Sequence, residues 1–337
     1  MNWAWFEQLD RVRRMQGAML DATGLRPLET PYAVVHSEPA VCLRRYSGAN
    51  AAGPVVLIVP APIKRPYIWD LAPEVSVVRR CLAAGARVFL VDWQPAPPQF
   101  GLHHYAERLL LDCLGAAGGE RAILLGHSLG GLFAAIFSAL HAARVRGLAL
   151  LASPLNFGPG ATVFSRMAEA LGSDELPDAL PGSFLGAASF NAAPGTFGWE
   201  RWTDAALSLA HAAELRRHLQ VERWSLDESP LPRRLVADLV TLIVRDNRFA
   251  RGTLKLHART AAPSRLTAPL LCVIDRHCAV VPPETVLPVF DAAGSDDKTL
   301  LDYEREPGVS LQHVGPLVGA RAHASLWPRI IRWIQAR

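Results

Sequence analysis

The feature that most constrains this chain is a short glycine-rich segment between two apolar runs. Residues 126–130 read Gly-His-Ser-Leu-Gly, and a further glycine follows. The apolar run 122–125 before it predicts a buried strand, and residues 132–137 after it predict the start of a helix. A turn this sharp has no room for side chains at its two glycines, and it lifts the Ser128 hydroxyl clear of the strand. The segment therefore indicates a nucleophilic serine, in preference to an ordinary glycine-rich turn.

The rest of the chain alternates strand and helix patterns around this junction. A glycine-flanked serine between strand and helix is typical of the α/β-hydrolase fold. The predicted strands are residues 33–36, 41–46, 55–59, 87–91, 122–125, 148–151, 270–274 and 299–301. The first two form an expected antiparallel pair. The remainder predict a mostly parallel, doubly wound sheet, which places the chain in the α/β class.

The alternation breaks after residue 154. Residues 155–265 carry helical patterns, loops with Gly and Pro, and little strand signal. We expect this segment to be an inserted helical lid over the carboxyl ends of the strands, where a site belongs. Residues 1–154 and 266–337 then form the α/β-hydrolase core.

Composition limits the classes of partner. The 337 residues are half hydrophobic, which allows a large core, and the net charge of +4 comes without any block of like charge. Nucleic acid is therefore not an expected partner. The five cysteines are odd in number and mostly lie in apolar runs, so we expect reduced thiols in a cytoplasmic protein. Neither a cofactor nor a metal site is expected.

The N-terminal segment needs a separate interpretation. Residues 1–17 mix charged side chains with Trp3 and Phe6, and they lack the continuous apolar run of a signal peptide. No stretch is apolar enough to predict an integral membrane segment. We expect a helix packed on the body of the protein, with contact to a lipid or polyester surface as the alternative.

A serine nucleophile requires a base, and in this fold the base follows the acid in the chain. His313 comes after the last predicted strand and before the final predicted helix, which is the expected place. His323 is the alternative, although it is expected at the start of that helix and facing away. His127, next to the nucleophile, is expected to point elsewhere and to line the site as a substrate-binding residue.

The acid is expected on the loop after the strand that ends at residue 274. Such loops commonly carry an aspartate four residues before the proline of a Val-Pro pair, but Cys278 has that position before Pro282. Asp275 is the carboxylate nearby, so it is the predicted triad acid. Its alternative role is to cap the following turn, which aspartate does well. A Ser-His dyad without an acid would act more slowly.

The oxyanion hole should combine two backbone N–H groups. One is that of Leu129, directly after the nucleophile. The other comes from the turn after residue 59, where Pro60 and Pro62 have no N–H to give. Ile63 is the predicted donor, with Ala61 as the alternative.

Several further motifs resemble those of polyhydroxyalkanoate synthases, especially the shorter class III catalytic subunit. The stretch from Val56 to Leu71 resembles the Arg-Pro-Tyr segment of that family. The other matching motifs are Val91-Asp92-Trp93, Ser153-Pro154-Leu155-Asn156-Phe157, Val221-Glu222-Arg223-Trp224 and His313-Val314-Gly315. The resemblance covers nearly the whole chain and implies acyl transfer from a hydroxyacyl-CoA thioester, with a homo-oligomer or a synthase-type partner subunit.

Two departures from that family bear on function. Its members carry a cysteine nucleophile where this chain has Ser128, and an aspartate where it has Cys278. A serine ester is readily deacylated by water, so the residues favour a serine esterase or thioesterase that cleaves an apolar ester or thioester. A synthase-like acyltransferase is the alternative that the resemblance favours. A third alternative is a weakened relative that binds polyester or a synthase.

Overall fold

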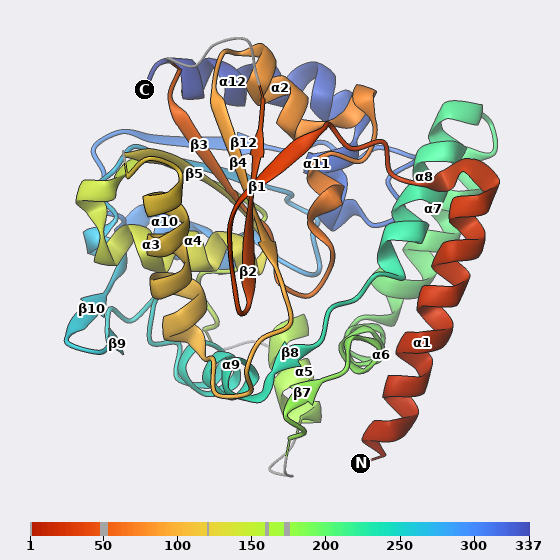
Figure 1. Cartoon of the computed structure of the whole chain (residues 1–337), viewed down its shortest axis with the longest axis horizontal. Helices are drawn as coiled ribbons and strands as arrows, with labels where there is room; N and C mark the ends of the chain where they lie inside the picture. Colours follow the sequence, from red (N-terminus) through yellow and green to blue (C-terminus); the bar gives the residue numbers. More distant parts are fainter. Residues whose placement is uncertain (1, 48–52, 120, 159–161, 172–175) are drawn as a thin grey trace.

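The computed structural model describes residues 2–47, 53–119, 121–158, 162–171 and 176–337. Its centre is an eight-stranded sheet in the order β1-β2-β4-β3-β5-β6-β11-β12 (Figure 1). The strands are β1 (Tyr32–Glu38), β2 (Val41–Tyr46), β3 (Val55–Val59), β4 (Arg87–Trp93), β5 (Ala122–His127), β6 (Val145–Leu151), β11 (Leu270–Ile274) and β12 (Lys298–Asp302). β2 pairs antiparallel with β1 and β4, and the other neighbours are parallel. The predicted strands and α/β-hydrolase sheet are confirmed.

Helices cover both faces of this sheet because its strands are apolar on both sides. In β3, the side chains of Val55, Leu57 and Val59 join one core with α3 and α4. Those of Val56 and Ile58 join the other core with α2, α11 and α12. The helices are α2 (Val77–Ala83), α3 (Leu109–Ala116), α4 (Leu129–Leu140), α10 (Leu287–Ala292), α11 (Gly315–Val318) and α12 (Trp327–Gln335). Burial on both faces is typical of parallel sheets between helical layers.

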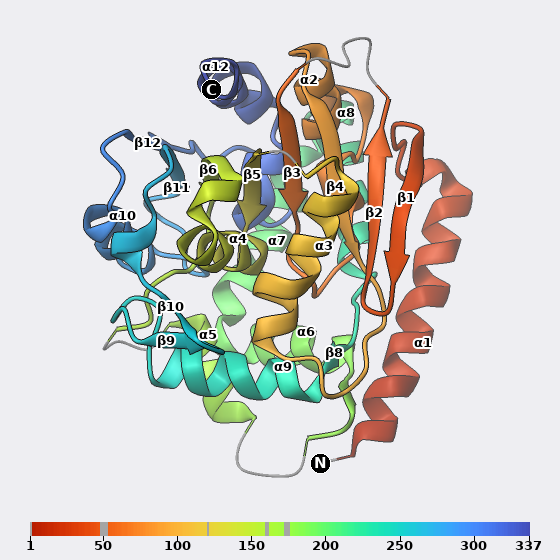
Figure 2. The ribbon, with the colours of Figure 1, turned by 60° about the vertical axis from the view of Figure 1, so that its left-hand side comes forward.

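The segment between β6 and β11 is largely helical, as its sequence predicts. Its helices are α5 (Val163–Ala170), α6 (Gly182–Ala192), α7 (Glu200–Ser208), α8 (Ala212–Ser225) and α9 (Arg233–Asp238), with π-helical turns η6 (Gly195–Trp199) and η7 (Leu239–Arg245). Two short strand pairs interrupt them, β7 (Ala179–Leu180) with β8 (Leu231–Pro232) and β9 (Leu254–Leu256) with β10 (Arg259–Ala261). Figure 2 shows α5, α6 and α9 gathered beyond one end of the sheet.

The N-terminal helix α1 (Trp3–Leu20) lies against this helical segment. The rings of Trp3 and Phe6 each approach Phe184 of α6 at 5.2 Å between centroids. The expected packing of the N-terminal helix on the body is therefore confirmed. Trp5 and Met15 are exposed on its outer side. In the part of the chain that the structure describes, no helix has the length and apolar character needed to cross a membrane.

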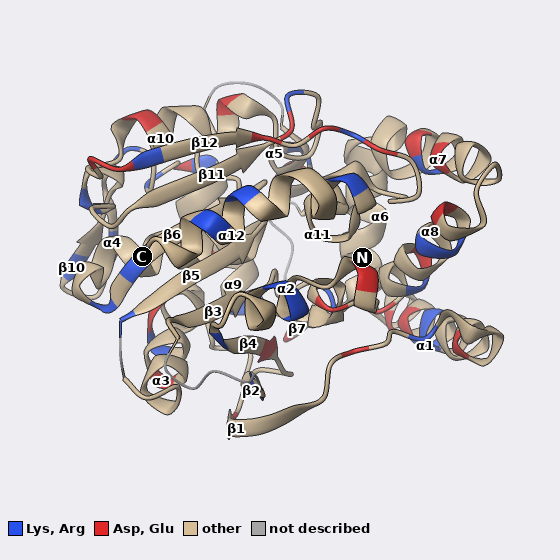
Figure 3. Cartoon of the chain, turned by 90° about the horizontal axis from the view of Figure 1, so that it is seen from above, with Lys and Arg blue, Asp and Glu red and all other residues tan. Residues whose placement is uncertain are grey.

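Positive and negative side chains are interspersed over the helices (Figure 3). Many form surface pairs, such as Arg108, just before α3, with Asp112 at 3.0 Å and Arg233 of α9 with Asp178 at 2.8 Å. Exposed pairs of this kind contribute little to stability. Positive and negative charges are therefore balanced over the surface, as the composition predicts. Burial of the apolar cores contributes most of the stability of the fold.

Candidate active site

The turn at Ser128 has the strained geometry that its sequence predicts. Ser128 joins β5 to α4 with φ 53° and ψ −131°, and it is buried. A side chain at Gly126 would place its Cβ 2.5 Å from the Cα of Gly131. One at Gly130 would meet the carbonyl oxygen of Val59 at 2.1 Å. Close backbone contact therefore requires both glycines. The positive φ of Ser128 is strained for an L-residue, and the packing of the surrounding fold offsets this strain.

The structure brings His313 against His127, the residue that precedes Ser128. His313 lies in a 3-10 turn (Gln312–Val314) after β12, and His127 precedes the serine at the end of β5. The two imidazole rings are 4.7 Å apart between centroids. The Nε2–H of His127 donates to the His313 carbonyl oxygen at 2.8 Å. His127 therefore anchors the backbone of the predicted base, and it lines neither of the two cavities described below.

Burial keeps both imidazoles neutral. It lowers the pKa of His127 to about 4, although the hydrogen bond to the His313 carbonyl raises it somewhat. It also lowers the pKa of His313 well below 6.5, and the nearby His127 lowers it further. Desolvation disfavours the charged form of each ring. A neutral His313 has one ring nitrogen free of a proton, which a general base needs.

The structure does not bring Asp275 to His313. Its Oδ1 accepts from the N–H of His277 at 2.9 Å, and its Oδ2 accepts from Arg305 Nε at 2.9 Å. Among the described residues, no contact joins its carboxylate to His313. Instead, the Sγ of Cys278 lies 3.8 Å from His313 Nδ1. Asp275 therefore has the turn-capping role that its sequence left open.

The alternative base, His323, is occupied elsewhere. Its Nε2–H donates to the Leu317 carbonyl oxygen at 2.7 Å, and its Nδ1 accepts from Arg80 Nε. Its ring stacks on Trp327 at 5.9 Å. Burial lowers its pKa to about 4. With both ring nitrogens bound on the α2 and α12 side of the sheet, His323 has no nitrogen for Ser128.

The two predicted oxyanion residues lie on the wall of one cavity. Leu129 is the first residue of α4, so its N–H has no acceptor within the helix. Ile63 lies in the turn after β3, which is held where Trp93 Nε1–H donates to the Pro60 carbonyl oxygen at 2.8 Å. Both residues line a cavity of about 80 Å³. Their place on one wall agrees with the two amides binding one oxyanion. That role stays a prediction.

The cavity is lined only by apolar side chains. Most of them come from the helical segment between β6 and β11. The lining residues are Ile63, Leu129, Phe157, Phe164, Met167, Ala168, Leu171, Leu185, Leu231, Val236, Leu239, Val240, Ile243 and Val244. An apolar surface of this kind favours hydrophobic groups over polar ones.

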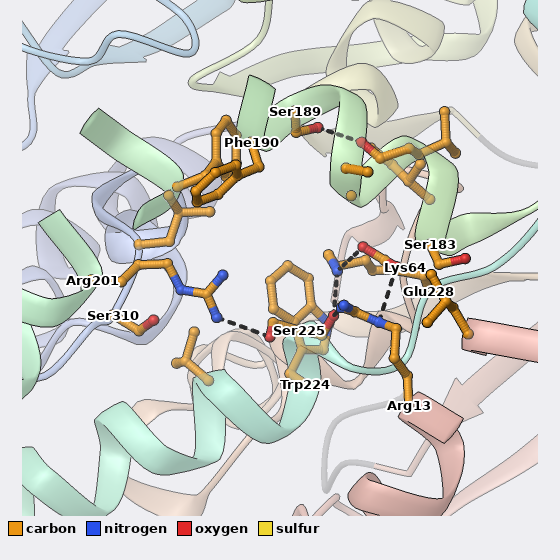
Figure 4. A pocket seen from close by; sticks show the side chains of 18 of the residues that line it. Arg13, Lys64, Ser183, Ser189, Phe190, Arg201, Trp224, Ser225, Glu228 and Ser310 are labelled. Atoms are coloured by element: carbon orange, nitrogen blue, oxygen red, sulfur yellow. Dashed lines mark hydrogen bonds and ion pairs between the residues drawn. The ribbon is translucent and has the colours of Figure 1, made fainter. Parts of the chain in front are cut away.

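A second cavity, of about 490 Å³, adjoins the first and shares Ile63 and Leu185 with it. It lies among α1, α6 and α8 and reaches the loop before His313 (Figure 4). Lys64 Nζ bonds Glu228 Oε1 at 3.0 Å there, and Arg13 Nε lies 3.3 Å from the other Glu228 oxygen. Burial lowers the pKa of Lys64, while Glu228 opposes that shift. The cavity therefore combines an apolar floor with paired charges.

Sequence reasoning missed the group that fixes the His313 loop. Asp204 on α7 is buried and accepts from the N–H groups of Gly308 at 3.0 Å and Ser310 at 2.8 Å. Its Oδ2 also lies 2.7 Å from His218 Nδ1 on α8. The Ser310 hydroxyl donates in turn to Glu222. The contacts of Asp204 with this loop join positions 104 and 106 apart in the chain, so no local pattern signals them.

Comparison with known proteins agrees with this architecture. The model of the alpha/beta hydrolase family matches residues 55–294. The chain is 26% identical to the poly(3-hydroxyalkanoate) polymerase subunit PhaC of Allochromatium vinosum, over 98% of this chain and 96% of that protein. It is 28% identical to the PhaC subunit of Haloarcula marismortui, over 92% of this chain and 68% of that protein.

Solved structures share the fold at lower identity. Esterase E22 superimposes with a TM-score of 0.59 at 13% identity, covering 92% of this chain and 99% of that one. The monoacylglycerol lipase of Paleococcus ferrophilus gives a TM-score of 0.57 at 16% identity, covering 89% and 99%. The chain therefore belongs to the alpha/beta hydrolase family and is a polyhydroxyalkanoate-synthase-like member of it, an enzyme of the hydrolase or acyltransferase type.

Proposed function

We propose that this enzyme forms an acyl-enzyme on Ser128 from an apolar ester or thioester and that water then releases the acyl group. The observation that carries the proposal is the strained turn at Ser128, with the neutral imidazole of His313 held beside it through His127. Strained serine turns of this kind are characteristic of acyl-transferring enzymes of this fold. Serine activated by an adjacent imidazole is the corresponding chemistry.

The chemical steps follow from the roles assigned to these groups. His313 takes the proton of the Ser128 hydroxyl as its oxygen attacks the substrate carbonyl carbon. The N–H groups of Leu129 and Ile63 stabilise the resulting oxyanion. Collapse of this tetrahedral intermediate expels the alcohol or thiol, which receives the proton from His313. A water then gives its proton to His313, attacks the acyl carbon, and releases the acid while Ser128 regains its proton.

The apolar cavity suggests the class of substrate. Its lining offers no hydrogen-bond partner from side chains, so it suits an alkyl chain and disfavours a polar acyl group. We assign residues 155–265 as the lid that supplies most of this surface, and residues 1–154 and 266–337 as the core. We assign the larger adjoining cavity, which has polar groups and shares Ile63 and Leu185 with the apolar one, to the leaving group of such a substrate.

A fluorophosphonate probe tests the acyl-enzyme directly. Labelling should occur in the native enzyme and disappear in Ser128→Ala. The native enzyme should also turn over p-nitrophenyl esters of short and medium chain length. If neither labelling nor turnover depends on Ser128, and hydroxyacyl-CoA is not consumed either, the proposal fails. A weakened relative that binds polyester or a synthase would then be the better account.

The length of the match to PhaC subunits favours a second candidate. Here the thiol leaves when a hydroxyacyl thioester acylates Ser128. The acyl group then passes to the hydroxyl of another hydroxyacyl thioester, so an ester bond forms and Ser128 regains its proton. The similarity covers 98% of this chain, lid segment included. Incubation with a hydroxyacyl-CoA separates the two candidates. Thiol release with polymer formation identifies the transferase, and thiol release with free hydroxy acid identifies the hydrolase.

A further inference from the structure

A thiol contacts the Nδ1 atom of the proposed base. Cys278 Sγ lies 3.8 Å from His313 Nδ1, and the N–H of Val281 donates to the same sulfur at 3.3 Å. Both Cys278 and His313 are buried. Resting on the proposed function, we propose that Cys278 is a positioning residue that orients His313 without charge, in the place where triads of this kind hold a carboxylate.

The carboxylate of Asp275, on the same turn, contacts other groups, so the thiol of Cys278 is the side chain that faces His313. One Asp275 oxygen accepts the His277 N–H and the other accepts from Arg305. The Cys278 N–H donates to the Asp275 backbone carbonyl oxygen at 3.1 Å, so the two residues share one turn. That turn holds the Cys278 side chain toward His313 and leaves the Asp275 carboxylate engaged with Arg305. Asp275 therefore supports the loop, and Cys278 faces the base.

The thiol is protonated near neutral pH. Burial is the main cause that raises the pKa of Cys278 to about 11. The charge of Asp275 also acts to raise it, while the N–H groups of Val281 and Val280 and the charge of Arg305 act to lower it. The His313 pKa is shifted down by burial and by His127. Together these titratable and charged groups favour the neutral form of both side chains, so a neutral thiol contacts a neutral imidazole. No ion pair of the cysteine-protease kind forms between them.

A neutral thiol controls the imidazole less strictly than a carboxylate does. A carboxylate only accepts hydrogen bonds, so it fixes the proton on Nδ1 and leaves Nε2 free to take the serine proton. A thiol both accepts and donates weakly. When it donates to Nδ1, the proton of the ring sits on Nε2, and that tautomer cannot act as the base. The imidazolium formed during attack also lacks an anionic neighbour.

Four variants test this role. Cys278→Asp places a carboxylate that the Val281 N–H can still reach, and we expect kcat/KM on a p-nitrophenyl ester to rise about tenfold or more. Its anion should also move the acid limb of the pH profile to higher pH. Cys278→Asn, with the same size and no charge, should not reproduce either change. Cys278→Ala should lower kcat about fivefold with little change in KM.

A second buried cysteine provides the matched control. Cys272 lies in β11 and is fully buried among apolar side chains. Cys272→Ala should lower the melting temperature and leave the acid limb where it is. If Cys278→Ala behaves in the same way, with stability alone changed, Cys278 is a packing residue and the inference is wrong. The alanine variants decide the matter even if Cys278→Asp does not fold.

Labelling with fluorophosphonate separates this inference from the proposed function. If the native enzyme is not labelled at Ser128, the proposed function fails. If it is labelled but Cys278→Asp does not shift the acid limb and Cys278→Ala keeps the native kcat, the positioning role alone is overturned. An acid limb that shifts upward in Cys278→Asp and not in Cys278→Asn supports the role.

Discussion

Two histidines compete for the role of base at the residue scale, and their hydrogen bonds distinguish them. His313 sits beside the strained turn of Ser128, whereas both nitrogens of His323 are bound to Leu317 and Arg80. Ser128→Ala and His313→Ala should each lower kcat by about 10³-fold or more and by similar amounts, because nucleophile and base act as a unit.

The control for this prediction is His323→Ala. It should lower the melting temperature, since it leaves Arg80 and the Leu317 carbonyl without a partner, and it should keep most of the activity. Steady-state kinetics and thermal unfolding of the three variants decide the assignment. A larger loss of kcat in His323→Ala than in His313→Ala would reverse it.

Asp275 gives the second prediction at this scale. Because its carboxylate caps the turn at His277 and pairs with Arg305, Asp275→Asn should cost about 1–3 kcal/mol of unfolding free energy. Activity should remain within about fivefold of the native value, since its carboxylate has no recorded contact with His313. Asp302→Asn, at a half-exposed pair with Arg276, is the control and should change neither quantity. Crippled turnover at unchanged stability would restore Asp275 as the acid.

The proposed nucleophile and base could be identified from sequence because each carries a local signature. Ser128 lies in a glycine-flanked turn, and His313 has a fixed place between the last strand and the last helix. The Asp275 carboxylate contacts His277 and Arg305 instead of His313, because sequence order fixes which loop bears a carboxylate but not where its side chain points. The contact of Cys278 with His313 joins positions 35 apart, and only the folded chain shows it.

At the scale of elements, α7 acts on the loop before His313. The Asp204 carboxylate accepts from two N–H groups of that loop and contacts His218. Asp204→Ala should leave those buried groups without a partner and free the loop, lowering both the melting temperature and kcat, the latter about tenfold. The control is Asp178→Ala, where the lost partner is Arg233 at an exposed pair. Normal kcat in a folded Asp204→Ala would show that the loop holds His313 unaided.

The apolar cavity provides another element-scale prediction. Ile243 of η7 is nearly fully buried and lines this cavity, so Ile243→Ala should lengthen the space for an acyl chain. The ratio of kcat/KM for medium-chain over short-chain p-nitrophenyl esters should rise about threefold to tenfold. Ile136→Ala on α4 removes the same atoms from the core and does not line the cavity. It should cost about 2–5 kcal/mol of stability and leave that ratio unchanged.

The elements themselves were predictable to different degrees. Buried strands such as β3 and β5 are continuous apolar runs, and their sequence defines them almost to the residue. The π-helical turns and the pairing of β7 with β8 were not predicted. Two-residue strands have no periodicity to detect, and their existence depends on the packing of the segments on either side.

For the whole molecule, sequence order was enough to predict the architecture. Strands alternate with helices along the chain, and a long helical segment lies between β6 and β11. The rules for connecting strands allow few sheet orders for such a sequence of elements. The cavity between that segment and the sheet was not predictable in shape, because its lining combines residues from Ile63 to Val244. Side chains so far apart in sequence meet only through tertiary packing.

The final prediction concerns the stability of the whole molecule against acid. Burial lowers the folded-state pKa of His127 and His323 to about 4, from 6.5, and that of His313 well below 6.5. Between about pH 6.5 and pH 4 the unfolded chain therefore binds more protons than the folded chain. Stability should fall as pH falls through this window, by about 1.4 kcal/mol per pH unit for each such histidine. Glu29, whose pKa burial raises, opposes the trend near the lower end.

Chemical unfolding at a series of pH values measures this slope. His323→Gln should be less stable than the native protein at pH 7, yet its unfolding free energy should depend less steeply on pH between 6.5 and 4, because one proton-binding difference is gone. His211→Asn, at an exposed position before α8, is the control and should leave the slope unchanged. An equal slope in native protein and His323→Gln would mean that His323 is charged in the folded state. Its neutral contacts with Leu317 and Arg80 would then need a different proton arrangement, because a protonated ring has no lone pair to accept from the Arg80 guanidinium.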